Sequence, residues 1–163
     1  TDIHSVFTDF CDTILLVHRG QKTVSSTVGH GLLKDNPYAT ARFAQAQENM
    51  IAMKSILKSG DLDAFIALVE SEALTLHSLM MSSNPYFILM KPNTLKIIEA
   101  IWAKREKDAV KWCFTLDAGA NVHFLYPQAD QAAAKAFIEE ELAQYCENGA
   151  FIHDEVGMGA ERR

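Results

Sequence analysis

The sequence predicts an α+β domain in which helices cover one face of a small antiparallel sheet. The chain has 163 residues, of which 48% are hydrophobic and 22% charged, as expected for one compact domain. Apolar residues recur at three- and four-residue steps through the middle of the chain, which predicts long helices. Short apolar runs near both ends predict strands, and such a mixture of elements forms layers around a single core.

The first predicted element is a strand at Thr13–Val17, a fully apolar run that is β-branched at its start. Residues 19–21 supply a turn, and Lys22–Ser26 predicts a second extended piece. The small residues of Ser25–Gly31 then predict a loop.

An antiparallel helix pair is predicted next. The first helix begins near Asn36-Pro37 and ends at Ser59-Gly60, because proline is tolerated in a first turn and glycine favours a helix end. Its expected buried residues are Phe43, Ala46, Met50, Met53 and Leu57. Asp61 is expected to cap the second helix, which runs to residues 82–85. The residues expected on its buried face are Phe65, Val69, Leu76 and Met80.

The remaining elements are a short helix, a hairpin, a last helix and a strand. Thr94 or Asn93 is expected to cap the short helix, which points Leu95, Ile98 and Trp102 inward. The hairpin joins two extended runs, Val110–Leu116 and Val122–Tyr126. Asp130 is expected to cap the last helix, whose inner face carries Ala134, Ile138, Leu142 and Tyr145. Phe151–Val156 predicts a strand, either at the edge or in the centre of the sheet.

Charge and hydropathy exclude several partners. Lysine and arginine total 15 against 21 acidic residues, and no stretch gathers basic side chains, so nucleic acid is not an expected partner. No uniformly apolar run comes near the roughly 20 residues that cross a bilayer, so no membrane partner is expected. Three widely spaced cysteines, Cys11, Cys113 and Cys146, favour reduced thiols and a cytoplasmic location.

Familiar catalytic and metal-binding motifs are missing. The six histidines include no pair at the spacing that places two imidazoles on one helix face, so no protein-supplied metal site is expected. Neither a Walker-type lysine loop nor a Gly-x-Ser-x-Gly elbow occurs. These nucleotide-binding and hydrolase classes are therefore set aside.

Two loops remain as candidate sites. Ser25–Gly31 combines hydroxyls with glycines whose N–H groups suit phosphate oxygens, although a plain solvated connection explains the same residues. Asp117 stands at the end of an apolar strand, where Ala118, Gly119 and Ala120 would let a ligand approach its carboxylate. Aspartate is also a routine turn residue that bonds to its own backbone, so a purely structural turn explains this position equally well.

Several motifs in order resemble a known family. The segment from Lys22 through Ser25–Gly29 looks like a Lys and Ser-Ser-Thr-x-Gly-Met segment, and Thr115–Asn121 looks like Thr-Phe-Asp-Ala-Gly-Pro-Asn. The family has a histidine near a helix end, and His77 is similar to it in place. Asn84-Pro85 stands where the family has a double proline, and Val156–Gly159 is similar to a Val-Gly-x-Gly stretch. Over nearly its whole length the chain resembles the C-terminal half of mevalonate diphosphate decarboxylase, within the GHMP kinase superfamily.

The sequence also departs from the family pattern at four positions. The family residues are methionine, phenylalanine and proline where this chain has His30, Leu116 and Ala120, and Pro85 stands alone where two prolines are usual. These changes leave the exact substrate open.

The resemblance implies a domain organisation and a reaction. Residues 1–163 would form a single C-terminal GHMP-type domain of ferredoxin-like fold, with the N-terminal ATP-loop domain absent from this chain. The complete enzyme would be an ATP-dependent decarboxylase that makes isopentenyl diphosphate. ATP and Mg²⁺ would bind mainly through the missing half, so this chain alone is expected to be inactive.

The resemblance also assigns residues and partners. Asp117 would be the catalytic carboxylate, and Ser25, Ser26, Thr27 and Ala118 would bind the substrate. The expected partners are a small diphosphate substrate and the protein's own N-terminal domain, with a homodimer left open. Two different functions stay open as well: a related kinase or decarboxylase acting on another mevalonate derivative, and a non-catalytic α+β binding or dimerisation module.

Overall fold

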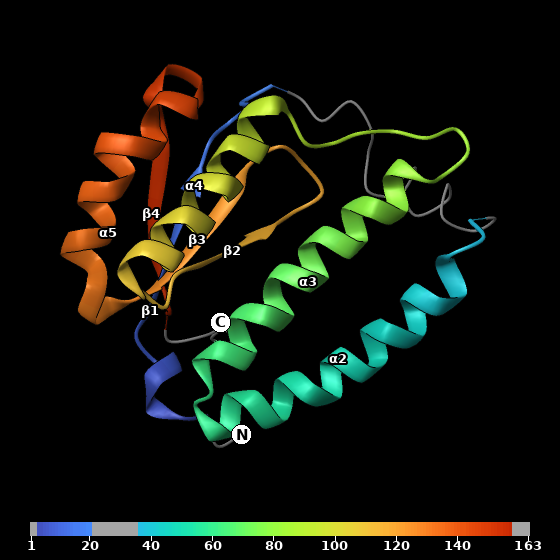
Figure 1. Ribbon diagram of the computed structural model, residues 1–163, viewed down its shortest axis with the longest axis horizontal. Coiled ribbons are helices and arrows are strands. Elements are labelled where there is room, and N and C mark those ends of the chain that lie inside the picture. The colour runs from blue at the N-terminus through green and yellow to red at the C-terminus, as the bar shows by residue number, and fades with distance from the viewer. Residues whose placement is uncertain (1–2, 21–35, 158–163) are drawn as a thin grey trace, which may run out of the picture.

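The computed structural model describes residues 3–20 and 36–157, and the predicted order of strand, three helices, hairpin, helix and strand is confirmed (Figure 1). A short 3₁₀ turn, Ser5–Phe7, comes before the first strand. The last helix continues through a π-helical turn, Ile138–Leu142, and a 3₁₀ turn, Ala143–Tyr145, and a separate 3₁₀ turn, Glu147–Gly149, follows the extended Cys146. The helices and strands are β1 (Phe10–Leu15), α2 (Ala39–Ser59), α3 (Leu62–Met81), α4 (Pro92–Asp108), β2 (Cys113–Leu116), β3 (Val122–Pro127), α5 (Gln131–Phe137) and β4 (Phe151–Glu155).

The four described strands form one antiparallel sheet in the order β2-β3-β1-β4. The predicted hairpin is confirmed, since Leu116 pairs with Val122 across β2 and β3. β1 begins at Phe10, three residues before the predicted start, and ends at Leu15. β4 pairs with β1 alone and is therefore an edge strand, which decides the question that the sequence left open.

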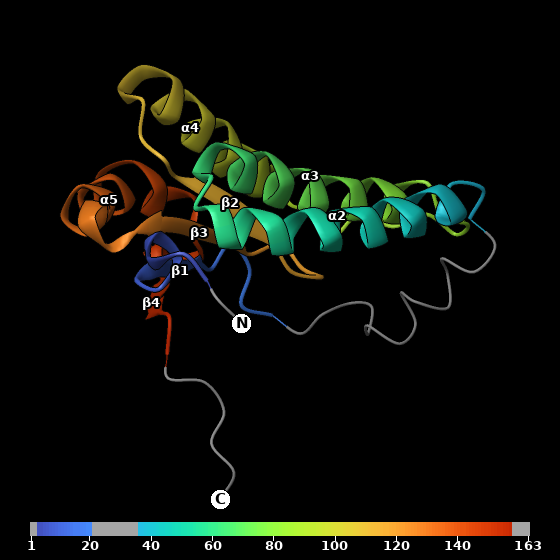
Figure 2. The ribbon, with the colours of Figure 1, turned by 90° about the horizontal axis from the view of Figure 1, so that it is seen from below.

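The main core lies between the sheet and the helices α4 and α5 (Figures 1 and 2). α3 packs against β2, and α2 packs against α3 (Figure 1). Burial of large apolar and aromatic side chains supplies most of the stabilisation of the fold. Side chains that are fully buried here include Leu15, Ile97, Ile101, Trp112, Phe114, Phe124 and Ile138.

The buried face predicted for α2 is wrong in part. Phe43 and Met50 are 55% and 58% exposed, whereas Arg42 and Asn49 form contacts with α3. The helix packs on α3 at the margin of the domain, so its covered stripe is mostly only half-buried. That stripe keeps Ala46, Met53 and Leu57 of the predicted face. Its predicted end is confirmed, because Gly60 adopts the left-handed conformation that a helix C-cap favours, with φ of 78°.

Two cap predictions are wrong, and one is confirmed. Asp61 caps α3 by accepting the N–H of Ala64 at 3.0 Å. α4 instead begins at Pro92, and the hydroxyl of Thr94 accepts the backbone N–H of Lys91 at 3.0 Å. Asp130 makes no cap bond, because its carboxylate accepts the indole N–H of Trp112 at 2.9 Å.

The inward face of α4 differs from the predicted one. Leu95 and Trp102 are 48% and 39% exposed, and only Ile98 of the predicted trio is buried. The core-facing residues of this helix are Thr94, Ile97, Ile98 and Ile101. On α5 and its continuation, Ala134, Ile138 and Leu142 are buried as predicted.

All three cysteines are free and buried, as the sequence predicts for reduced thiols. Burial raises the pKa of Cys113 to about 12 and that of Cys146 to about 11, so neither thiol ionises near neutral pH.

One described helix, α3, is long and apolar enough to cross a membrane when judged by length and composition alone. In the structure it packs against β2 on one side and α2 on another, as the core helix of a folded domain does. It also carries the buried Glu70 and His77, both of which are bonded within the domain.

Candidate active site at the hairpin loop

The predicted loop between β2 and β3 lines a small cavity of about 80 Å³. Two of the predicted site residues, Asp117 and Ala118, lie together there. The other lining residues come from the segment after β1, the segment before α4 and the rest of the loop: His18, Gly20, Ile88, Leu89, Lys91, Gly119, Ala120 and Asn121.

Gly119 allows the Asp117 carboxylate to fold over the loop. The N–H of Gly119 donates to the Asp117 carbonyl at 2.8 Å. A Cβ atom at position 119 would lie 2.8 Å from Asp117 Oδ1, closer than real Cβ atoms come to another heavy atom. A side chain at 119 would therefore push the carboxylate out of its present place.

His77 holds the start of this loop from α3. Its Nε2 donates to the carbonyl of Asp117 at 3.0 Å, and the ring is 1% exposed. Burial lowers the pKa of His77, an effect partly opposed by the carbonyl and charge of Asp117. The ring is therefore neutral near pH 7 and acts as a fixed hydrogen-bond donor.

Two further bonds hold the end of the loop. The hydroxyl of Thr94, buried at the start of α4, donates to the carbonyl of Ala120 at 2.6 Å. Asn121 accepts the backbone N–H of His18 at 3.0 Å, which links the loop to the segment after β1. Bonds from three separate elements thus fix the backbone around Asp117.

Two basic residues that no sequence motif marked also line this cavity. Lys91 lines it from the start of α4, and His18 lines it from the segment after β1, where its ring nitrogen lies 3.5 Å from a carboxylate oxygen of Glu147. No sequence pattern links these positions to Asp117, so only the tertiary structure could reveal them. A carboxylate beside a cation can bind and orient a hydroxyl-bearing anionic substrate.

Three predicted substrate-binding residues, Ser25, Ser26 and Thr27, lie outside the described residues. Within residues 3–20 and 36–157, no group of three or more histidine, cysteine, aspartate or glutamate side chains could hold a metal ion.

Residues 13–158 match the family model of the mevalonate 5-diphosphate decarboxylase C-terminal domain. A phosphomevalonate decarboxylase from Haloferax volcanii is 28% identical over 94 residues, which cover 58% of this chain and 29% of that protein.

Solved structures share the fold. The mevalonate pyrophosphate decarboxylase of Streptococcus pyogenes superimposes with a TM-score of 0.82 at 23% identity, over 99% of this chain and 48% of that one. A complex of the protein called MDDEF with MVAPP, AMPPCP and magnesium has a TM-score of 0.79 at 20% identity, over 90% of this chain and 43% of that one. The chain thus spans less than half the length of these relatives, and it belongs to the mevalonate 5-diphosphate decarboxylase C-terminal domain family.

Proposed function

We propose that this chain is the C-terminal domain of an ATP-dependent decarboxylase that converts mevalonate diphosphate to isopentenyl diphosphate. The observation that carries the proposal is the Asp117 carboxylate, which lies at the end of β2 in a loop fixed by His77 and Thr94. The family match over residues 13–158 supports it, because that match includes the whole loop.

Asp117 has the chemistry that the first step requires. The tertiary alcohol of mevalonate diphosphate is a poor nucleophile, so a carboxylate beside it can accept or orient its proton. ATP with Mg²⁺ supplies the phosphoryl group that turns the hydroxyl into a leaving group. Departure of phosphate together with carbon dioxide then leaves the double bond of the product.

The phosphates of the substrate are proposed to bind to the Ser25–Gly31 loop and to the backbone next to Asp117. We propose that Ser25, Ser26 and Thr27 donate to phosphate oxygens, together with the N–H of Ala118 beside the carboxylate. The single positive charge of Lys91 at the cavity cannot balance a diphosphate. Because the net charge of this chain is −6, further cations must come from the other domain.

The binding of ATP and Mg²⁺ is proposed to depend mainly on the N-terminal half. The Asp117 cavity of about 80 Å³ is small beside the roughly 300–1,000 Å³ of pockets that hold drug-sized ligands. The described residues also lack an acidic cluster for a metal. AMPPCP and magnesium in the complex of a relative support their use by the family. This chain alone is therefore proposed to be inactive, and its buried free thiols support a cytoplasmic location.

A second candidate substrate is the monophosphate, mevalonate phosphate. The relative from Haloferax volcanii is a phosphomevalonate decarboxylase, and the changed residues Leu116 and Ala120 border the loop that carries Asp117. Two further candidate functions are a related kinase that phosphorylates without decarboxylation and a non-catalytic binding or dimerisation module.

The test is an assay of the complete enzyme with MgATP and, separately, mevalonate, its phosphate and its diphosphate. The expected result is release of carbon dioxide and ADP with the diphosphate, and with neither of the other two substrates. Carbon dioxide from the monophosphate would select the second candidate, and ADP without carbon dioxide would indicate a kinase. No ADP with any of the three would favour the non-catalytic module.

A further inference from the structure

A histidine, His123, lies on the face of the sheet that turns away from α4 and α5. Its neighbours on β3, Val122 and Phe124, belong to the main core. Successive side chains of a strand point to opposite faces, so the ring of His123 is on the other face. The ring is 24% exposed and is therefore within reach of a ligand.

The position of His123 along β3 brings it close to the candidate site. β3 pairs antiparallel with both β1 and β2, so its beginning lies beside the ends of those two strands. His123 follows Val122 at this beginning, and it pairs with Thr115, which comes shortly before Asp117. His123 is therefore placed beside the end of β2 that leads into the candidate carboxylate.

Asp12 on β1 holds the ring and favours its charged form. Nδ1 of His123 donates to Asp12 Oδ2 at 2.7 Å, while Asp12 Oδ1 is covered and has no hydrogen-bond partner in the described structure. A covered carboxylate that lacks hydrogen bonds is costly unless a cation lies beside it. The bond to Asp12 raises the pKa of His123, partial burial opposes the rise, and the charge of Asp117 adds to it. The residues across from the ring, Ile14 and Thr115, are uncharged.

The other nitrogen of the ring is open to a further hydrogen bond. Among the described residues, the ring of His123 is bonded through Nδ1, and Nε2 has no partner. In the charged form of histidine both ring nitrogens carry a proton and donate. His123 therefore offers a cationic donor at the edge of the sheet that carries Asp117.

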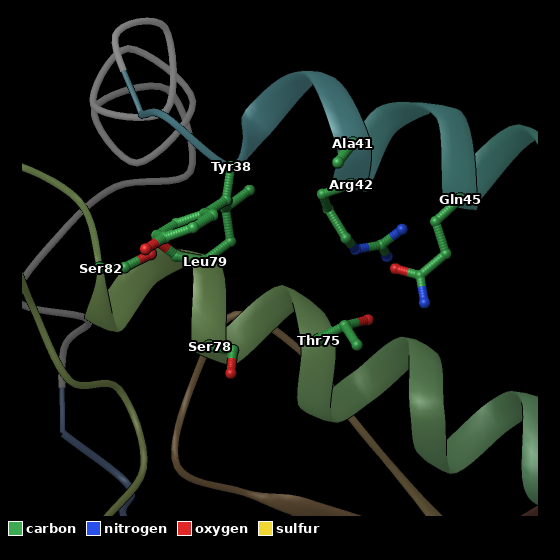
Figure 3. Close-up of a pocket in the computed structure, with 8 residues that line it drawn as sticks. All are labelled: Tyr38, Ala41, Arg42, Gln45, Thr75, Ser78, Leu79 and Ser82. Atoms are coloured by element: carbon green, nitrogen blue, oxygen red, sulfur yellow. The ribbon is translucent and has the colours of Figure 1, made fainter.

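Two other partly buried cations of the domain are balanced by carboxylates. A cavity of about 470 Å³ lies between α2 and α3, and Arg42 is the one charged residue among those that line it (Figure 3). Arg42 donates to Glu72, so its charge is already balanced. Arg105 likewise donates to both oxygens of Glu70. Neither of them lies at the Asp117 loop, which leaves His123 as the cation placed to meet a ligand there.

We propose that His123 is a substrate-binding residue whose Nε2–H donates to a phosphate oxygen of the substrate while Asp12 holds Nδ1. The proposal rests on the proposed function, because a substrate whose hydroxyl lies at Asp117 carries its phosphate a short distance along the same small molecule. His123 adds one positive charge to that of Lys91, and the other domain balances the rest of a diphosphate.

The chemistry of the reaction favours the phosphate over the carboxylate as the group that His123 binds. The carboxylate loses its charge as carbon dioxide departs, so a cation bound to it would stabilise the reactant more than the transition state. The diphosphate keeps its charge throughout the reaction. A cation on the diphosphate therefore holds the substrate without opposing the loss of carbon dioxide.

Binding in the absence of ATP gives the first test. The complete enzyme and its His123→Gln variant are titrated calorimetrically with mevalonate diphosphate and, separately, with mevalonate, which has the carboxylate but no phosphate. At about pH 6, where histidine is charged, His123→Gln should weaken binding of the diphosphate about tenfold, because a charge-assisted hydrogen bond is lost. Its weaker affinity for mevalonate should not change. Equal losses for both ligands would overturn the assignment to the phosphate.

Two further variants make the test specific. His153→Gln is the matched control, because Nδ1 of His153 bonds to the buried Thr13 on the core face of the same sheet, and this variant should bind the diphosphate as the parent does. Asp12→Asn keeps an acceptor for Nδ1 and removes the charge, so His123 should lose its proton at a lower pH. Affinity for the diphosphate should then fall at a lower pH in Asp12→Asn than in the parent, which tests the proposal even if His123→Gln does not fold.

Turnover with MgATP separates this inference from the proposed function. His123→Gln should raise KM for the diphosphate about tenfold with kcat nearly unchanged, the pattern of a contact that is equal in the ground state and the transition state. A complete enzyme that releases no carbon dioxide would refute the proposed function, and the calorimetric comparison would still decide the role of His123. Equal affinity of the parent and His123→Gln for the diphosphate, or no binding by the parent, would overturn the inference.

Discussion

At the scale of single residues, the position of Asp117 is determined by its neighbours. Gly119 leaves room for the carboxylate, and the neutral, buried His77 holds the carbonyl of the same residue. The backbone that carries the carboxylate is therefore fixed before any ligand arrives. Under the proposed function, this would lower the entropic cost of bringing a base to the reacting hydroxyl.

Replacement of Asp117 by asparagine should lower the turnover rate of the complete enzyme at least about 100-fold, because an amide cannot accept the proton. Substrate affinity and melting temperature should change little, since asparagine keeps the shape and one acceptor oxygen. Asp154→Asn, on the exposed strand β4, is the matched control and should retain full activity. Normal turnover by Asp117→Asn would reject the catalytic assignment, and a collapse in melting temperature would favour a purely structural turn.

Replacement of Ser26 by alanine tests the sequence-based assignment of the phosphate loop. A hydrogen bond to a charged group contributes about 1.5–3 kcal/mol, so Ser26→Ala should reduce kcat/KM roughly 10- to 100-fold. The unfolding midpoint should stay the same. Kinetic constants equal to those of the parent would mean that the loop is only a connection.

His77 should make stability depend on pH. Burial lowers its pKa in the folded state below the usual value of 6.5, so the unfolded state binds the proton more readily. The contribution of His77 to the free energy of unfolding is fully present above pH 6.5 and is lost as the pH falls toward the folded-state pKa. Urea unfolding at about pH 7.5 and about pH 5.5 should show a larger loss for the parent than for His77→Gln.

His123 should show the opposite dependence of stability on pH and therefore serves as a control for His77. Its Nδ1 lies 2.7 Å from Asp12 Oδ2, and this bond raises the pKa of His123. Its contribution is present below pH 6.5 and is lost as the pH rises through the folded-state pKa, so His123→Gln should lose more stability, relative to the parent, at acidic pH. The His77 prediction fails if parent and His77→Gln lose equal stability between the two pH values.

At the scale of elements, α3 connects most of the domain. His77 is bonded to the loop that carries Asp117, Glu72 pairs with α2, and Glu70 is bonded to α4. Arg105 of α4 donates to both oxygens of Glu70, at 2.7 and 3.0 Å, and Trp102 donates its indole N–H at 2.8 Å. This pair, in which Glu70 is buried and Arg105 is half-buried, joins the two helices that hold the loop.

Arg105→Leu should lower the free energy of unfolding by about 2 kcal/mol, less than the roughly 3–5 kcal/mol of a fully buried pair, because Arg105 is 25% exposed and Trp102 still donates to Glu70. Denaturant unfolding measures the change. The double variant Glu70→Leu/Arg105→Leu should recover much of the loss, since no unpaired charge remains buried. A single variant that unfolds at the same denaturant concentration as the parent would contradict the role of the pair.

At the scale of the whole molecule, the chain has its own core but only a small cavity at the candidate site. Aromatic side chains of the sheet and of α5 interlock, with Phe124 lying within 6.0 Å of Trp112, Tyr126 and Phe137 between ring centroids. The Asp117 cavity, in contrast, is too small for a nucleotide. The domain is therefore expected to fold without the rest of the enzyme and to depend on it for function.

The isolated chain should melt cooperatively, because a core of this size is normal for its length. It should show no micromolar affinity for MgATP in calorimetric titration. The complete enzyme provides the positive control under the same conditions. Micromolar binding by the chain alone would show that the ATP site lies in this domain.

The sequence by itself determined the order of the elements, the hairpin, the end of α2 at Gly60 and the start of α3 at Asp61. These features follow from local signals, such as a left-handed glycine, a capping carboxylate and two apolar runs joined by a tight turn. The motif around Asp117 was likewise readable, because its residues are contiguous.

Only the tertiary structure decided which faces are buried and which distant residues meet. α2 lies at the margin of the domain, so its apolar residues Phe43 and Met50 are exposed, although their spacing is that of a buried face. Periodicity shows that a helix has an apolar stripe and does not show what covers it. Lys91 and His18 line the Asp117 cavity because three separate segments converge there, and the Glu70–Arg105 pair depends on how α3 crosses α4. Contacts between residues far apart in sequence leave no local signal, so the packing of the elements alone decides them.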